Sequence, residues 1–194
     1  MSRRLAGLGG WVAGLLAVLL CSGVLAQGAP GRAEQRRRML DLLLKKEPPA
    51  EAQVRKEGPG ADSTLVDIIN DSDVDVVSRR RAIEALGFFD NKRSRQMLSG
   101  IITDPAWEKV FRIAALETIG RVMGEEAFEM VKDRALDPDA EVRLACVKAL
   151  EAMRGVRALG LLRSLQLQEH DPAVVREIDK ALGRLNRNNL EGTP

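Results

Sequence analysis

The sequence predicts an all-α protein built as an α-solenoid, in which antiparallel helix pairs stack one on another. Three observations lead to this prediction. Aromatic residues make up only 3% of the 194 residues and Tyr is absent, whereas β-sandwiches and barrels rely on aromatic side chains in their strands. Asp recurs at steps of 33 or 34 residues from Asp71 to Asp171. Apolar residues follow each of these Asp residues at helical spacing, so the chain is a repeat protein.

The first 26 residues have the organisation of a signal peptide. Two arginines precede an apolar stretch that is densest over residues 11–20, and Val24 and Ala26 form a site that signal peptidase accepts. We therefore expect cleavage before Gln27. The rest of the chain is then periplasmic or secreted.

Two other outcomes remain open for this leader. Residues 5–25 are long enough to span a bilayer as an uncleaved anchor, and Cys21 is the candidate lipid site if the protein is a lipoprotein. Only these two outcomes imply a membrane location, with the protein facing outward. All three routes export residues 27–194, which hold 28 basic and 28 acidic residues because the leader has two arginines and no acid. A neutral exported chain has no overall field that attracts nucleic acid, so we expect no nucleic-acid partner.

The exported chain is expected to have three parts. Residues 27–61 form an N-terminal segment, in which the apolar spacing of residues 34–46 predicts a helix and the Pro- and Gly-rich residues 47–60 predict a mobile linker. The solenoid follows over residues 62–187. Residues 188–194 are expected to be a disordered tail.

Each repeat begins with an Asp, and in the last three copies a Pro follows it. Asp accepts hydrogen bonds from the free amides of a first helical turn, and Pro at the first helical position has no amide to leave unpaired. The motif therefore predicts four helix starts, at Asp71, Asp104, Asp137 and Asp171.

One apolar face recurs downstream of each start at i, i+4 and i+7, the spacing of one face of an α-helix. Its four copies are Ala82, Leu86 and Phe89; Ala115, Ile119 and Val122; Cys146, Leu150 and Met153; and Ile178, Leu182 and Leu185. A second set accompanies it at Leu65 and Ile69, Leu98 and Ile102, Val131 and Ala135, and Leu162 and Gln166. Each unit is therefore a helix pair, and stacking of neighbouring units closes the core. Glycines that suit positive φ lie near the predicted turns, at Gly87, Gly120 to Gly124 and Gly155.

The third repeat carries a specific family resemblance. The run from Asp137 to Arg143, followed by Ala149 and Leu150, resembles a HEAT repeat of the short type also called phycobilisome-lyase-like. Residues 104–116 are a looser copy. The resemblance implies an armadillo-like helical fold.

In this family the repeated Asp and Arg are structural, with Arg reaching the turn Asp of an adjacent repeat. The resemblance therefore implies a structural ladder, whose members here are Asp71, Asp104, Asp137, Asp171, Arg79, Arg112 and Arg143. The fourth repeat has Val175 where the Arg is expected, which leaves its last link in doubt.

No catalytic pattern predicts an enzyme. One His and two Cys exclude a site with several imidazole or thiolate ligands, so we expect no metal and no cofactor. His170 is expected to be a solvated turn residue, and Cys146 a small core residue. The arginine triplets at 36–38 and 79–81 do not form a phosphate-binding patch, because successive helix residues point about 100° apart.

We expect a non-catalytic scaffold that binds another protein in the cell envelope, because stacked repeats offer extended surfaces. Trp107 and Phe88 are the candidate partner-binding residues, since both fall outside the predicted core face. The alternative for Trp107 is packing across a repeat junction, and for Phe88 packing on the next turn. The family's other name implies a second function, a lyase-type or accessory factor for a covalently modified protein.

Overall fold

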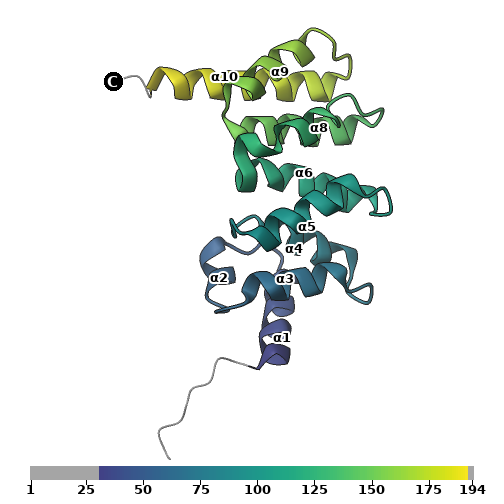
Figure 1. Ribbon diagram of the computed structural model, residues 1–194, viewed down its shortest axis with the longest axis vertical. Helices are drawn as coiled ribbons and strands as arrows, with labels where there is room; N and C mark the ends of the chain where they lie inside the picture. The colour runs from purple at the N-terminus through teal and green to yellow at the C-terminus, as the bar shows by residue number, and fades with distance from the viewer. Residues whose placement is uncertain (1–30, 192–194) are drawn as a thin grey trace, which may run out of the picture.

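The computed structural model describes residues 31–191, with side chains described as far as residue 187. This part of the chain is helical and has no strand. Figure 1 shows the helices stacked along the long axis of the molecule, as the α-solenoid prediction requires. The α-helices are α1 (Arg32–Leu43), α2 (Glu51–Arg55), α3 (Ala61–Asn70), α4 (Val76–Leu86), α5 (Lys92–Thr103), α6 (Lys109–Met123), α7 (Phe128–Lys132), α8 (Ala140–Met153), α9 (Val156–Gln166) and α10 (Pro172–Glu191), with a 3-10 turn at Gly124–Ala127 before α7.

The helices form two layers. In one layer α4, α6, α8 and α10 pack side by side in sequence order, while α3, α5, α7 and α9 form the other layer. At the N-terminal end α1 packs against α3 and α4, and at the C-terminal end α10 packs against α8 and α9. The predicted architecture of stacked helix pairs is therefore confirmed, with α1 as a further member of the stack.

The core lies between the two layers and contains nearly all of the predicted apolar positions. Every member of the second, third and fourth copies of the first apolar face is buried. In the first copy Ala82 and Leu86 are buried, but Phe89 is only half-buried because α4 ends at Leu86. In the second set Gln166 is exposed, and its amide donates to Asp179 Oδ1 at 2.7 Å.

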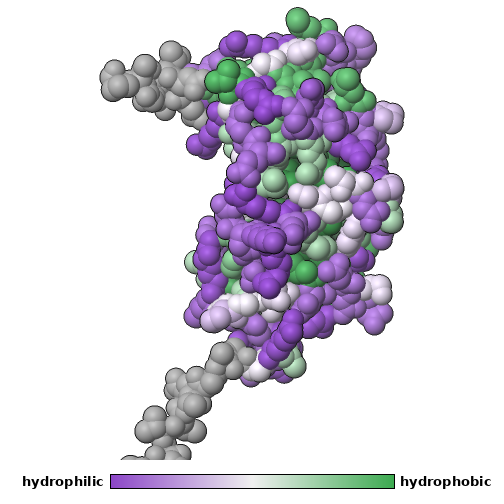
Figure 2. Space-filling model, in the orientation of Figure 1, coloured by the Kyte–Doolittle hydropathy of each residue, from purple (hydrophilic) through white to green (hydrophobic). Residues whose placement is uncertain are grey.

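The three most exposed large apolar side chains lie in the C-terminal half of the chain. Leu136, Val156 and Leu167 are 71%, 87% and 85% exposed. Figure 2 shows hydrophobic residues near the C-terminal end, whereas much of the remaining visible surface is hydrophilic. Polar side chains therefore cover the core over most of this face.

Three of the four helices begin later than the Asp motif predicts. α4 begins after the N-cap Asp75 and α8 after the N-cap Asp139, and each cap side chain accepts a hydrogen bond from a first-turn amide. α6 begins after Glu108, without a side-chain cap. Only α10 begins directly after its motif, at Pro172.

Asp71, Asp104 and Asp137 instead close the turns that precede their helices. Asp171 caps α10 as predicted, because its side chain also accepts a hydrogen bond from the Val174 amide of the first turn, at 3.2 Å. Each of the four side chains accepts a hydrogen bond from the amide two residues later, which is the geometry of an Asx-turn. The donors are Asp73 to Asp71 at 2.9 Å, Ala106 to Asp104 at 2.9 Å, Asp139 to Asp137 at 2.9 Å, and Ala173 to Asp171 at 2.8 Å. An Asp that already serves the turn leaves the cap to a later residue, so the helix starts further along.

Residues 47–60, where the sequence predicts a mobile linker, contain α2 and are held at several points. The Val54 side chain of α2 is fully buried. The Gln35 side chain donates to the carbonyls of Glu57 and Pro59 at 2.8 and 3.0 Å. Just before this segment, Arg81 donates to the carbonyls of Leu43, the last residue of α1, at 2.6 Å and of Lys46 at 3.1 Å. A Pro- and Gly-rich composition thus marks irregular backbone here, and the buried contacts fix it in place.

The turn glycines differ in their backbone. Gly124, where α6 ends, has a positive φ of 53°, whereas Gly87 and Gly155 have negative φ. Gly120 lies inside α6 and is buried. A Cβ at Gly120 would lie 2.3 Å from the carbonyl oxygen of Ala149 on α8, so this glycine permits a close approach of two helices.

The ends of the chain extend past the described residues. The backbone is helical as far as Glu191, where the sequence predicts a disordered tail from residue 188, and residues 192–194 lie outside the described range. The predicted leader also lies outside it, including the cleavage site before Gln27 and the candidate lipid site Cys21. None of the helices described here is long and apolar enough to cross a bilayer.

Candidate functional site

Three adjoining clefts mark the outward surface of the layer formed by α4, α6, α8 and α10. Two of them, of about 370 and 350 Å³, are lined by α4, α6 and α8, and the third, of about 690 Å³, is lined by α6, α8 and α10. Glu117 lines the first two, and Arg121 and Ala152 line the last two, so the clefts are continuous. We call this surface the grooved face, and its members include Glu84, Phe88, Ile113, Glu117, Arg121, Leu144, Lys148, Ala152 and Arg184.

The N-terminal half of the grooved face combines apolar side chains with both acidic and basic ones. Ile113 and Leu144 are partly buried in its 370 Å³ cleft. Burial raises the pKa of the Glu84 carboxyl above its ordinary value, and the attraction of Arg80, which forms an ion pair with it, acts in the opposite direction. Glu117 lies on the neighbouring helix and raises that pKa further.

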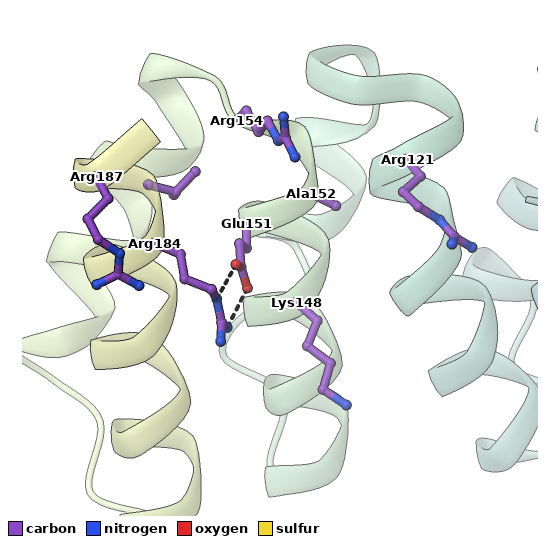
Figure 3. Close-up of a pocket in the computed structure, with 8 residues that line it drawn as sticks. Arg121, Lys148, Glu151, Ala152, Arg154, Arg184 and Arg187 are labelled. Atoms are coloured by element: carbon purple, nitrogen blue, oxygen red, sulfur yellow. Dashed lines mark hydrogen bonds and ion pairs between the residues drawn. The ribbon is translucent and has the colours of Figure 1, made fainter. Parts of the chain in front are cut away.

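The C-terminal half is basic. Five basic side chains and one carboxylate, Glu151, line the 690 Å³ cleft. Figure 3 shows Arg184 of α10 facing Glu151 of α8, with Arg121 across the cleft on α6. Arg184 Nη2 lies 2.7 Å from Glu151 Oε2 and 2.9 Å from Glu177 Oε1, and these partners raise the pKa of the guanidinium. Lys148 Nζ lies 2.7 Å from Glu117 Oε1 on α6, so ion pairs join α6, α8 and α10.

The two sequence-predicted binding residues are placed differently. Phe88 is half-buried, lines the 350 Å³ cleft and lies under the Arg121 guanidinium, 5.9 Å from ring centroid to guanidinium carbon. Trp107 is half-buried at the junction of α4 and α6, where its ring meets Phe111 edge-on at 5.9 Å and the Arg79 guanidinium at 5.7 Å. The structure thus brings Phe88 to the grooved face, whereas Trp107 has packing contacts across a repeat junction. A binding role for either residue stays a prediction.

The comparison with known families reports one similarity. A model of the HEAT-repeat family matches residues 63–151. This segment is therefore similar to HEAT repeats. It runs from α3 into α8 and so includes three helices of the grooved face. HEAT repeats are commonly protein-interaction scaffolds and are generally non-catalytic. No curated protein matches the chain significantly.

The arginines of the predicted HEAT ladder bind turn carbonyls. Arg79 Nε donates to the Ile69 carbonyl at 2.9 Å, and Arg143 Nη1 to the Asp137 carbonyl at 2.8 Å. Arg112 has only a long contact, 3.5 Å, to a carbonyl of its own turn. The family resemblance implied ion pairs between these arginines and the ladder Asp side chains. Within residues 31–187 none of the three arginines forms such a pair. The ladder Asp that does form an ion pair is Asp71, with Arg36 of α1.

Arg143 also forms an ion pair with Glu169 in the turn before α10. The repeat pattern in the sequence does not identify Glu169. The Arg143 guanidinium donates to both carboxylate oxygens, at 2.7 and 2.9 Å. Together with the amides of His170 and Asp171, which donate to the same carboxylate, Arg143 lowers the pKa of Glu169 to about 2. His170 itself has an exposed side chain.

The one cysteine in the described part of the α-solenoid is unsuited to nucleophilic chemistry. Cys146 is fully buried in α8, and burial raises the pKa of its thiol to about 12. A nucleophilic cysteine requires the thiolate, which such a pKa suppresses at neutral pH. Among the residues with described side chains, no group of three or more His, Cys, Asp or Glu is arranged to hold a metal ion.

Proposed function

We propose that this protein is an exported, non-catalytic HEAT-repeat scaffold that binds another protein of the cell envelope through the grooved face. The proposal depends on one observation: the three clefts adjoin one another across α4, α6, α8 and α10, the four neighbouring helices of one layer. A stacked-repeat surface of this kind suits an extended segment or a broad patch of a partner. The repeat step of 31 to 33 residues in the first apolar face supports the short, phycobilisome-lyase-like type of HEAT repeat.

The leader pattern supports export, and its processing decides the location. Cleavage before Gln27 would release the scaffold from the membrane. We expect N-terminal sequencing or intact mass of the protein from its native host to give Gln27 as the first residue. Retained residues before Gln27, or a lipid on Cys21, would place the scaffold on a membrane.

The chemistry of the grooved face supports binding. Many of its charged groups are already matched by neighbours of the same chain, as in the pairs Lys148–Glu117 and Arg184–Glu151. Such pairs hold the helices in register and present a preformed surface, which lowers the ordering cost of association.

Filling the clefts at their junction tests the proposal. Ala152 is partly exposed and lines two of the three clefts, so we expect Ala152→Trp to block the surface without disturbing the core. Ser164→Trp is the matched control, because Ser164 is exposed on α9 in the other layer. The tagged variants are crosslinked in the native host, purified and analysed by mass spectrometry.

We expect the wild type and Ser164→Trp to retain one and the same partner and Ala152→Trp to lose it. Equal recovery by all three proteins would show that the partner binds elsewhere. Recovery of no partner by the wild type would contradict the scaffold function.

A further inference from the structure

The C-terminal cleft of the grooved face has a charge that a general scaffold function leaves unexplained. We call it the basic cleft, and its charged lining consists of Arg121 on α6, Lys148, Glu151 and Arg154 at α8, and Arg184 and Arg187 on α10. The exported chain as a whole is neutral by sequence. The excess of positive charge is therefore a local property of this end of the solenoid.

Not all of this charge is matched within the chain. Arg184 is held by Glu151 and Glu177, and Lys148 is paired with Glu117. Arg121, Arg154 and Arg187 are exposed and have no carboxylate partner among residues 31–187. Arg154 ends α8 in the left-handed conformation, with φ 55°. Its side chain therefore emerges from the turn and borders the cleft, as Figure 3 shows.

The spacing of the cations distinguishes between kinds of anion. They stand on three successive packed helices, whose axes are about 8–10 Å apart in helix packing generally. One phosphate group cannot bridge cations on all three helices. An extended polyproline-II segment rises about 3.1 Å per residue with three residues per turn, so every third side chain lies on the same side at steps of about 9 Å.

We propose that the basic cleft binds an extended acidic segment of the partner protein, with carboxylates about three residues apart that meet the cations of α6, α8 and α10 in turn. This inference rests on the proposed scaffold function and adds the chemistry of the bound segment. Arg121, Arg154 and Arg187, one from each of the three helices or its end, provide the charge that is unmatched among residues 31–187. The ion pair of Arg184 with Glu151 joins α10 to α8 within the cleft.

A synthetic peptide tests the proposal on the mature protein. The probe is a fluorescein-labelled nonapeptide with three Glu-Pro-Ser repeats, and its binding is measured by fluorescence anisotropy. The first control has Gln at all three Glu positions, and the second has the same composition with the three Glu adjacent. We expect the spaced acidic peptide to bind more tightly than both controls, and its affinity to fall as salt is raised from about 50 to about 300 mM.

Charge reversal identifies the residues. We expect Arg121→Glu/Arg154→Glu to weaken peptide binding by at least about tenfold. The matched control is Arg37→Glu/Arg163→Glu, which reverses two exposed arginines outside the cleft, on α1 and α9, and should leave the affinity unchanged. Circular dichroism confirms that each variant is folded.

Several outcomes would overturn the inference. One is equal peptide binding by the cleft variant and its control. Another is equal binding of the spaced and the adjacent Glu peptides. A third is that the peptide does not bind, whereas phosphatidylglycerol vesicles bind in a manner that depends on Arg121 and Arg154. If the peptide fails but Ala152→Trp still loses the native partner, the inference fails and the scaffold function stands. If the peptide binds as expected but no native partner is recovered, the cleft chemistry stands and the scaffold function fails.

Discussion

Helices α6 and α8 approach each other closely at Gly120, and adding one methyl group there tests this contact. In Gly120→Ala the new Cβ would lie 2.3 Å from the Ala149 carbonyl oxygen, whereas ordinary contacts lie at 3.4–4 Å. Relief requires α6 and α8 to separate by about 1 Å, because the obstacle is backbone and no side-chain rotation removes it.

The expected free-energy change combines two opposing effects. Overpacking of a core costs about 1–3 kcal/mol, and a clash with backbone belongs at the upper end of that range. Alanine is about 1 kcal/mol better than glycine within a helix, which offsets part of the cost. We therefore expect Gly120→Ala to lower the free energy of unfolding by about 2 kcal/mol, which corresponds to a urea midpoint lower by about 1 M.

Gly100→Ala is the matched control. Gly100 lies within α5 and is exposed, and the methyl group of an alanine there would have no atom within 4 Å, so only the helix propensity changes. We expect this variant to be about 0.5–1 kcal/mol more stable than the wild type. Urea unfolding followed by circular dichroism measures both variants. If Gly120→Ala were as stable as Gly100→Ala, α6 and α8 would not approach as closely as the structure shows.

Three further predictions concern other parts of the solenoid. Glu169 has a pKa of about 2 in the folded protein against an ordinary value of 4.5, so its ionised form stabilises the fold above pH 4.5 and this contribution is lost as the pH falls toward 2. The difference in unfolding midpoint between the wild type and Glu169→Gln should therefore shrink over that interval, and a constant difference would contradict the contact with Arg143. Leu43→Ala should cost about 2–5 kcal/mol because Leu43 is fully buried, whereas Leu44→Ala should cost far less because Leu44 is 61% exposed; equal losses in thermal unfolding would show that α1 is not packed on the stack. Cys146, with a thiol pKa of about 12, should resist iodoacetamide until the protein is unfolded, and mass spectrometry showing rapid alkylation of the native protein would refute its burial.

The two layers of the solenoid could be predicted from sequence because one physical constraint repeats. A helix that packs on both of its neighbours must bury one face, and burial imposes apolar residues at i, i+4 and i+7 in every copy. Ala115, Ile119 and Val122 follow this rule and are buried together. The same rule placed Phe89 in the core, but helix α4 ends at Leu86 and the periodicity does not continue into the turn.

Local hydrogen bonding explains why α4, α6 and α8 begin later than the Asp motif predicts. An Asp before a Pro can cap a helix or close an Asx-turn, and both use the same side-chain oxygen. Asp171 precedes its helix directly, whereas Asp137 closes a turn and leaves Asp139 to cap α8. The sequence contains both acidic residues without indicating which of them acts as the cap.

The grooved face could not be found from single residues. Arg121 and Arg184 occupy the same repeat position on α6 and α10, but the intervening α8 has Ala152 there. The charge of the basic cleft therefore arises from different positions of three helices that meet only in the folded stack. Phe88 was found because it lies one residue before a predicted core position, and Glu169 was missed because it lies in a turn outside both apolar sets.

A photo-crosslinking scan along both layers tests the central claim most directly. A benzoylphenylalanine residue is placed in turn at Glu141 and Lys148 on the grooved face, and at Arg163 and Ser164 on α9, and each protein is irradiated in its native host. The proposed function predicts crosslinks to one partner protein from Lys148 and from neighbouring positions of the grooved face, and none from α9. Crosslinks from α9 alone, or from no position in either layer, would contradict the claim that this solenoid binds its partner through the grooved face.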